Sequence, residues 1–144
     1  MKKWWMCLAL AFTTAISALA QQATDILGTW LNEEGDAKIE VYQEGEVFFG
    51  KLIWIKDYET LPKERQLDSK NPDPKLRTRS KLGMILMKDL VFDDDEWTDG
   101  EIYDARSGKL YSLTATLDGN NKLDLRGYVG VSLFGRTSSW TRAQ

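Results

Sequence analysis

The chemistry open to this chain is limited first by what it lacks. It contains no histidine, and its single cysteine, Cys7, lies near the N-terminus. The Ser-His and Cys-His nucleophile pairs are therefore excluded, and so are the common zinc and copper sites built from nitrogen and sulfur ligands. Acid–base catalysis would have to use a carboxyl, phenol or amine group with a shifted pKa.

Tyr103 and Asp104, together with Arg126 or Arg136, form the one group of residues that could act in this way, as in an isomerase or a hydrolase. Neighbouring strand residues point to opposite faces, so at most one of Tyr103 and Asp104 is expected to face a cavity. The competing interpretation is structural: Asp104 caps the turn at residues 106–108, and the arginines form cross-strand pairs on a solvated face. We favour the structural interpretation and assign no catalytic residue.

Charged clusters suggest a ligand rather than a metal. Between residues 70 and 81, five basic side chains accompany a single acid, Asp73, so this stretch is either a solvated loop or a cationic lid that meets an acidic group. The acidic run 93–96 does not fit a calcium loop, because Trp97 stands where an oxygen ligand is required and Gly100 comes two positions late. No metal site and no cofactor is expected.

Aromatic residues favour a binding function. Small-molecule pockets are mostly apolar with a few placed polar groups, and the chain supplies more aromatic side chains than one face of a small barrel needs. The same residues could equally form an ordinary core. They are Phe48, Phe49, Trp54, Tyr103, Tyr111, Tyr128 and Phe134.

Residues 1–20 have the features of a secretory signal peptide: Lys2-Lys3, an apolar run from Met6 to Ile16, and the small-x-small site Ala18-Leu19-Ala20. The apolar part is too short for a spanning helix. We expect export to the periplasm or beyond. Cleavage leaves a mature chain of residues 21–144, which forms one domain without a transmembrane segment and lacks Lys2 and Lys3. Loss of Lys2 and Lys3 takes the net charge from −3 to −5, which argues against nucleic acid as a partner. The oligomeric state is left open.

Alternation of apolar and polar residues predicts about eight strands joined by short polar turns. Examples are the strand from Ala37 to Tyr42 and the strand from Lys109 to Leu117, in which Tyr111, Leu113, Ala115 and Leu117 share one face. Gly83–Phe92 is ambiguous, and we predict a strand. The pattern fits an all-β fold, an antiparallel up-and-down barrel or a sandwich.

Two further features organise this fold. Residues 56–81 lack strand alternation and predict a lid, with one or two helical turns at Pro74–Thr78 and Leu76 turned inward. Gly28 and Trp30 begin the first strand, and Trp140 and Arg142 end the last. In a closed barrel these strands are neighbours, so the four residues are predicted to form the barrel closure, with the Arg142 guanidinium across the Trp30 indole.

The motifs of the chain resemble those of a family of small secreted bacterial proteins that is catalogued as a domain of unknown function and regarded as lipocalin-like (calycin-like). One departure is Ala105, where the family is expected to have proline. The resemblance implies an eight-stranded barrel with an internal or end-on cavity and brings no established ligand. The matching stretches are Gly28-x-Trp30, Asn71-Pro72-Asp73-Pro74-x-Leu76-Arg77-x-Arg79, Gly100-x-Ile102-Tyr103-Asp104-x-x-Ser107-Gly108-Lys109-x-Tyr111, Arg126-Gly127-Tyr128-x-Gly130 and Gly135-Arg136-Thr137-x-x-Trp140-Thr141-Arg142.

From the residues and the resemblance together, we expect an exported barrel that binds a small apolar or amphipathic molecule, lipid-like and acidic at its head. Two alternatives stay open: the barrel enzyme described above, and an envelope interaction or stress-accessory protein that works through the outside of the lid. The ligand-binding residues predicted are Trp54, Lys70, Asn71, Arg77, Arg79, Tyr103, Tyr111, Arg126, Tyr128 and Arg136.

Overall fold

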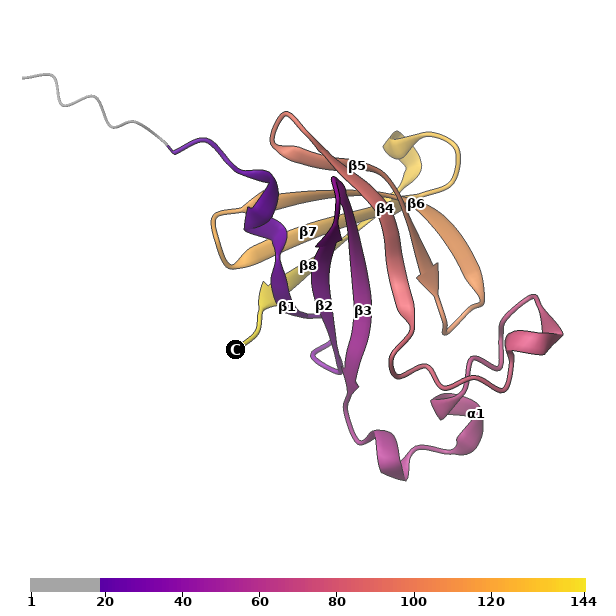
Figure 1. Ribbon diagram of the computed structural model, residues 1–144. Helices are drawn as coiled ribbons and strands as arrows, with labels where there is room; N and C mark the ends of the chain where they lie inside the picture. The colour runs from indigo at the N-terminus through magenta and orange to yellow at the C-terminus, as the bar shows by residue number, and fades with distance from the viewer. Residues whose placement is uncertain (1–18) are drawn as a thin grey trace, which may run out of the picture.

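Eight antiparallel strands form a closed barrel in which each strand pairs with its neighbours in sequence and β8 pairs with β1 (Figure 1). The computed structural model describes residues 19–144, so the signal peptide expected at residues 1–20 lies almost entirely outside the described residues. The all-β up-and-down barrel predicted from alternation is confirmed. The strands are β1 (Gly28–Leu31), β2 (Ala37–Glu44), β3 (Val47–Ile55), β4 (Ile85–Asp93), β5 (Glu96–Asp104), β6 (Lys109–Asp118), β7 (Lys122–Tyr128) and β8 (Arg136–Arg142).

The apolar residues of the alternating pattern face the interior of the barrel, and the polar residues between them face the outside. Ile39 and Val41 of β2 and Leu123 and Leu125 of β7 are buried, while the residues between them lie on the outer wall. The ambiguous segment at 83–92 forms β4, as predicted. Its Met87 and Leu90 are both fully buried, so the segment contributes to the core as a strand.

Glycines allow the wall to curve where large side chains press against it. The register between β3 and β4 shifts around Gly50, where a Cβ atom would lie 2.6 Å from Met87 Cε. At Gly100 a Cβ atom would lie 2.5 Å from Leu90 Cδ2. Both glycines thus mark a close approach between neighbouring strands.

One end of the barrel is sealed. The 3-10 turn η1 (Ala23–Ile26) lies across it, and the indole N–H groups of Trp30 and Trp97 donate to the carbonyl oxygens of Ile26 and Ala23 at 2.9 and 3.2 Å. The Arg142 guanidinium carbon lies 4.2 Å from the centroid of the Trp30 ring, which confirms the predicted closure. This end also carries the C-terminus.

The same guanidinium group holds η1 in place. It donates to the carbonyl oxygens of Leu27, Asp25 and Asn120 at 2.7–2.8 Å. A Cβ atom on Gly28 would lie 3.0 Å from Arg142 Nη1, so the glycine leaves room for the arginine. Trp140, the fourth residue of the predicted closure, instead borders the interior cavity of the barrel.

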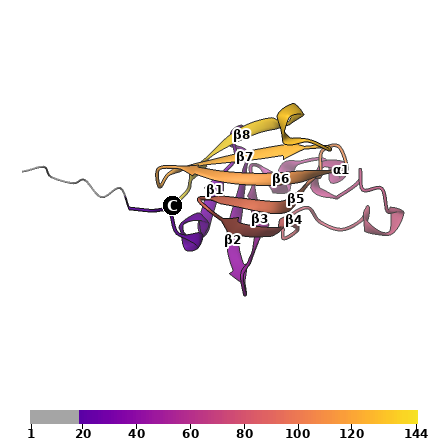
Figure 2. The same cartoon turned by 90° about the horizontal axis from the view of Figure 1, so that it is seen from above.

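The opposite end is open and carries the lid, which leaves β3 and returns to β4 at the far side from the C-terminus (Figure 2). The lid contains η2 (Tyr58–Thr60), the short helix α1 (Lys63–Gln66) and η3 (Pro74–Leu76). The predicted turn at Pro74 exists, with the Asp73 carboxylate accepting from Lys75 N at 3.0 Å. The prediction that Leu76 faces inward is wrong: its side chain is exposed, because η3 lies at the outer edge of the lid.

Between residues 19 and 144, no helix is both long enough and apolar enough to cross a membrane. The connections β1–β2, β3–β4, β5–β6 and β7–β8 all lie at the open end, since successive antiparallel strands reverse direction. A fourth 3-10 turn, η4 (Ser132–Phe134), belongs to the last of these connections.

Candidate ligand-binding site

The open half of the barrel contains a cavity of about 600 Å³, while the sealed half is filled by side chains such as Trp30, Phe48 and Trp97. This volume is within the usual range of small-molecule pockets. The deeper wall is apolar and is formed by Ile39, Leu52, Leu86, Ile102, Leu113 and Leu125.

The mouth of the cavity is predominantly cationic. Five basic residues border it against three acids, although the chain as a whole carries a net charge of −3. An apolar interior below a basic rim is a suitable surface for an amphipathic acid. The basic residues are Lys56, Arg65, Lys81, Arg106 and Arg136, and the acids are Glu34, Asp36 and Asp104.

Arg106 forms ion pairs with two of the three acids at the mouth. Its guanidinium group lies 3.1 Å from Asp36 Oδ1 and 3.6 Å from Glu34 Oε1, so it connects the β5–β6 turn to the β1–β2 turn across the mouth. Asn32, which is buried, holds the β1–β2 turn by accepting from the backbone N–H groups of Asp36 and Ala37. Asp104 accepts from Arg106 N and Ser107 Oγ, which is the turn-capping role expected for it.

The remaining cations are free to meet a ligand. Within residues 19–144, Lys56, Arg65, Lys81 and Arg136 form no salt bridge. Lys81 is half-buried, and this burial lowers the pKa of its ammonium group; the positive charges of Arg65 and Arg106 act in the same direction, and Asp68 and Asp104 oppose it. An anion in the mouth would relieve this unfavourable burial of an unpaired charge.

The backbone of the lid brings these cations together. Lys81 N donates to Gln66 O at 2.9 Å, and Leu67 forms an isolated bridge with Ser80, so the two arms of the lid pair like a short hairpin. This pairing places Lys81 beside the segment that carries Arg65. Lys81 belongs to the basic run noticed in the sequence, but Arg65 and Lys56 lie outside that run and were missed.

Asp68 fixes the lid to the barrel. Its carboxylate is fully buried and accepts hydrogen bonds from Asn71 Nδ2 at 2.8 Å, Arg79 Nε at 3.0 Å and the Tyr103 hydroxyl of β5 at 2.6 Å. Arg79 Nη2 adds an ion pair at 2.9 Å. Asp68 is one of five acids in the strand-free segment 56–81, and no local sequence pattern distinguishes it as this anchor.

Tyr103 is a hydrogen-bond donor in this arrangement. Burial raises the pKa of its phenol to about 12, and the hydrogen bond to Asp68 adds to the shift. The phenol is therefore protonated at neutral pH, which suits the donor role and does not suit a general base. Tyr103 and Asp104 both border the cavity. The expectation that at most one would face the cavity is not met at its rim, where both residues lie at the open end of β5, which ends at Asp104.

The ten predicted ligand-binding residues fall into three groups. Tyr103, Tyr111 and Arg136 border the cavity. Asn71, Arg77 and Arg79 make bonds within the lid, Arg77 Nε donating to Asn71 O at 2.7 Å, and Lys70 lies exposed on the lid. The other three lie on the outer wall: Trp54 in a separate hollow of about 330 Å³ with Lys38 Nζ 5.2 Å from its ring, Arg126 against η4, and Tyr128 on the outward face of β7.

Residues 28–142 match the family described as an uncharacterized protein conserved in bacteria, DUF2147. The chain belongs to this family. The match covers the whole barrel of this DUF2147 protein, from β1 to β8. A comparison with curated proteins found no match.

A solved structure confirms the lipocalin-like fold. It is described as protein HP1028 from the human pathogen Helicobacter pylori, a member of the lipocalin family, and it superposes with a TM-score of 0.72 at 23% sequence identity. The alignment covers 82% of each chain. At this identity the likeness establishes the fold of the DUF2147 barrel and leaves its ligand to be argued from the cavity.

Proposed function

We propose that the barrel binds a small amphipathic molecule with an apolar chain and an acidic head. The apolar chain occupies the deep part of the cavity, against residues such as Leu52, Leu113 and Leu125. The head lies at the mouth, where Lys81 and Arg136 supply positive charge without salt-bridge partners in the described chain. A lipocalin-like fold is consistent with small-molecule binding.

Lys81 is the observation that carries this proposal. Burying an ammonium group without a counter-ion is unfavourable, and the lowered pKa of Lys81 reflects that cost. A carboxylate at the mouth converts the cost into a charge-assisted hydrogen bond. A neutral head group of the same length gains no such bond, so the site should discriminate between an acid and an alcohol.

Displacement of a fluorescent fatty-acid probe tests this. Palmitate should displace the probe at lower concentration than hexadecanol does. Lys81→Met should weaken palmitate about tenfold or more, corresponding to the loss of one charge-assisted hydrogen bond, and leave hexadecanol unchanged. Lys75→Met is the matched control, because Lys75 is an exposed lid lysine that does not border the cavity. Equal displacement by acid and alcohol would rule out the acidic head.

We also propose that the protein acts after export, in the periplasm or outside the cell. The support is the leader pattern of residues 1–20, and the mature chain contains no cysteine, so its stability does not depend on the redox state of the compartment. N-terminal sequencing of the protein from separated cell fractions should find Gln21 as the first residue in the exported fraction. Met1 retained in a cytoplasmic fraction would contradict it.

A further inference from the structure

The β7–β8 connection displays apolar side chains to solvent. Exposed fractions are 74% for Val129, 57% for Val131, 80% for Leu133 and 81% for Phe134. Elsewhere in residues 20–144, no large apolar side chain exceeds the 50% of Leu110. The most exposed apolar groups of the barrel are therefore concentrated in one loop, and such concentrations mark interaction surfaces.

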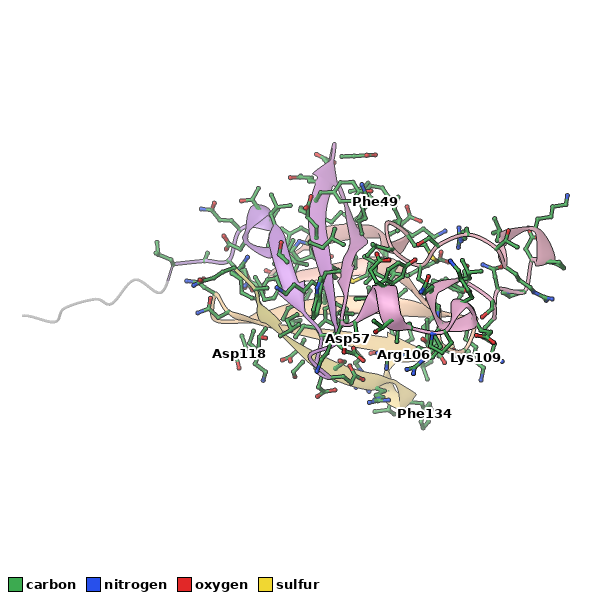
Figure 3. All side chains as sticks on the ribbon, turned by 90° about the horizontal axis from the view of Figure 1, so that it is seen from below. Phe49, Asp57, Arg106, Lys109, Asp118 and Phe134 are labelled. Atoms are coloured by element: carbon green, nitrogen blue, oxygen red, sulfur yellow. The ribbon has the colours of Figure 1, made fainter. Side chains whose placement is uncertain are left out.

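The conformation of this loop is fixed by the fold. The Arg126 guanidinium group donates to Ser132 O at 2.7 Å, Leu133 O at 3.2 Å and Thr137 Oγ1 at 3.0 Å, so η4 is braced from β7. Gly135 packs so tightly that an added Cβ atom would lie 2.7 Å from Gly127 O. Leu133 and Phe134 are thus held outward by a built structure, and Figure 3 shows Phe134 at the periphery of the molecule.

The charge around the loop selects one kind of partner. Residues 126–137 contain two arginines and no aspartate or glutamate, in a chain of net charge −3. Arg126 lies under the loop, and Arg136 follows it directly and is exposed. Apolar tips flanked by basic groups are the composition that binds the interface of a bilayer containing anionic lipids.

The loop also lies at the open end of the barrel, and Arg136 borders the cavity mouth. We propose that the β7–β8 loop docks the barrel on an anionic lipid surface, with Leu133 and Phe134 inserted among the acyl chains, so that the cavity mouth faces the membrane. This goes beyond the proposed function, because docking requires no ligand in the cavity.

Co-sedimentation with vesicles tests the docking. The purified protein should bind vesicles of phosphatidylcholine with phosphatidylglycerol more strongly than vesicles of phosphatidylcholine alone. Leu133→Ser combined with Phe134→Ser should weaken binding about tenfold or more, since two apolar side chains no longer leave water. Val91→Ser is the control, because Val91 is an exposed apolar residue of β4, outside the loop. All variants must carry the same N-terminus, so that residues 1–20 contribute equally.

Phe134→Leu should retain vesicle binding, because leucine keeps an apolar side chain at this position. This result would show that the serine variant loses binding through the missing apolar contact and not through a disturbed loop. Thermal melting of each variant checks that the barrel is intact. Binding that is unchanged in the double serine variant, or absent from the unsubstituted protein, would overturn the proposal. A concentration-dependent dimer that disappears in the same variant would also overturn it, because the loop would then be an interface between two copies of the chain.

Discussion

The Tyr103 hydroxyl donates a 2.6 Å hydrogen bond to the fully buried carboxylate of Asp68, and this bond joins the lid to the barrel wall. The other donors to Asp68, Asn71 and Arg79, belong to the lid itself. The position of the lid over the cavity therefore depends on a strand residue and a loop residue that are 35 positions apart in sequence.

Tyr103→Phe should lower the free energy of unfolding by about 1.5–3 kcal/mol, the usual contribution of a hydrogen bond to a charged group. The substitution leaves the ring and removes only the donor. Urea unfolding measures the change. Tyr128→Phe is the matched control, because Tyr128 is half-buried and makes no side-chain hydrogen bond in the described chain. An equal loss of unfolding free energy in both variants would show that the hydrogen bond to Asp68 contributes no extra stability.

The same bond predicts a pH dependence. The pKa of Tyr103 is raised from 10.0 to about 12 in the folded protein, so folding favours the protonated phenol. The stability from this bond is present below pH 10 and is lost as the pH rises from 10 to about 12. Unfolding titrations across this window should show a steeper fall for the unsubstituted protein than for Tyr103→Phe. Parallel curves would contradict the assignment.

Trp30→Ala should lower the free energy of unfolding by about 3–5 kcal/mol, as for other large buried aromatic residues. Trp30 is fully buried, and it contacts both η1 and Arg142. Trp54→Ala is the control on the outer wall, where the side chain is 38% exposed, and it should cost much less. A Trp30 variant that keeps its stability but loses ligand would make Trp30 part of the binding site.

Gly108→Ala should displace the lid. Gly108 has φ +74°, and a Cβ atom there would lie 2.0 Å from Lys70 O in the lid. Gly119 has a similar φ of +68° and no atom within 4 Å of its Cβ position. Both alanine variants should lose about 1–2 kcal/mol from the left-handed backbone, and only Gly108→Ala should also weaken binding of the fatty-acid probe. Equal effects on probe binding would show that the Lys70 contact does not matter.

Much of the fold follows from local patterns. The strands follow from alternation, because a barrel wall separates inward from outward residues with period 2. The closure of β1 on β8 follows from the chain ends, since an up-and-down barrel must bring Trp30 and Arg142 together. These relationships need no knowledge of the lid.

The binding site could be predicted only in part. Tyr103, Tyr111 and Arg136 lie on strands or at a strand end, so the geometry of a barrel was enough to predict that they border the cavity. Which cations of the lid face the cavity could not be predicted, because the lid has no periodicity. Its path depends on the long-range bonds of Asp68, which engage Arg79 within the lid and leave Lys81 at the mouth.

Carbon-13 NMR of palmitate labelled at its carboxyl carbon tests the central claim most directly, since it observes the head group itself. We predict a bound carboxylate signal distinct from that of free palmitate, which moves or disappears in Lys81→Met and is unchanged in Lys75→Met. The absence of a bound signal, or a bound signal that is identical in the two variants, would contradict the proposed binding of an acidic head group beside Lys81.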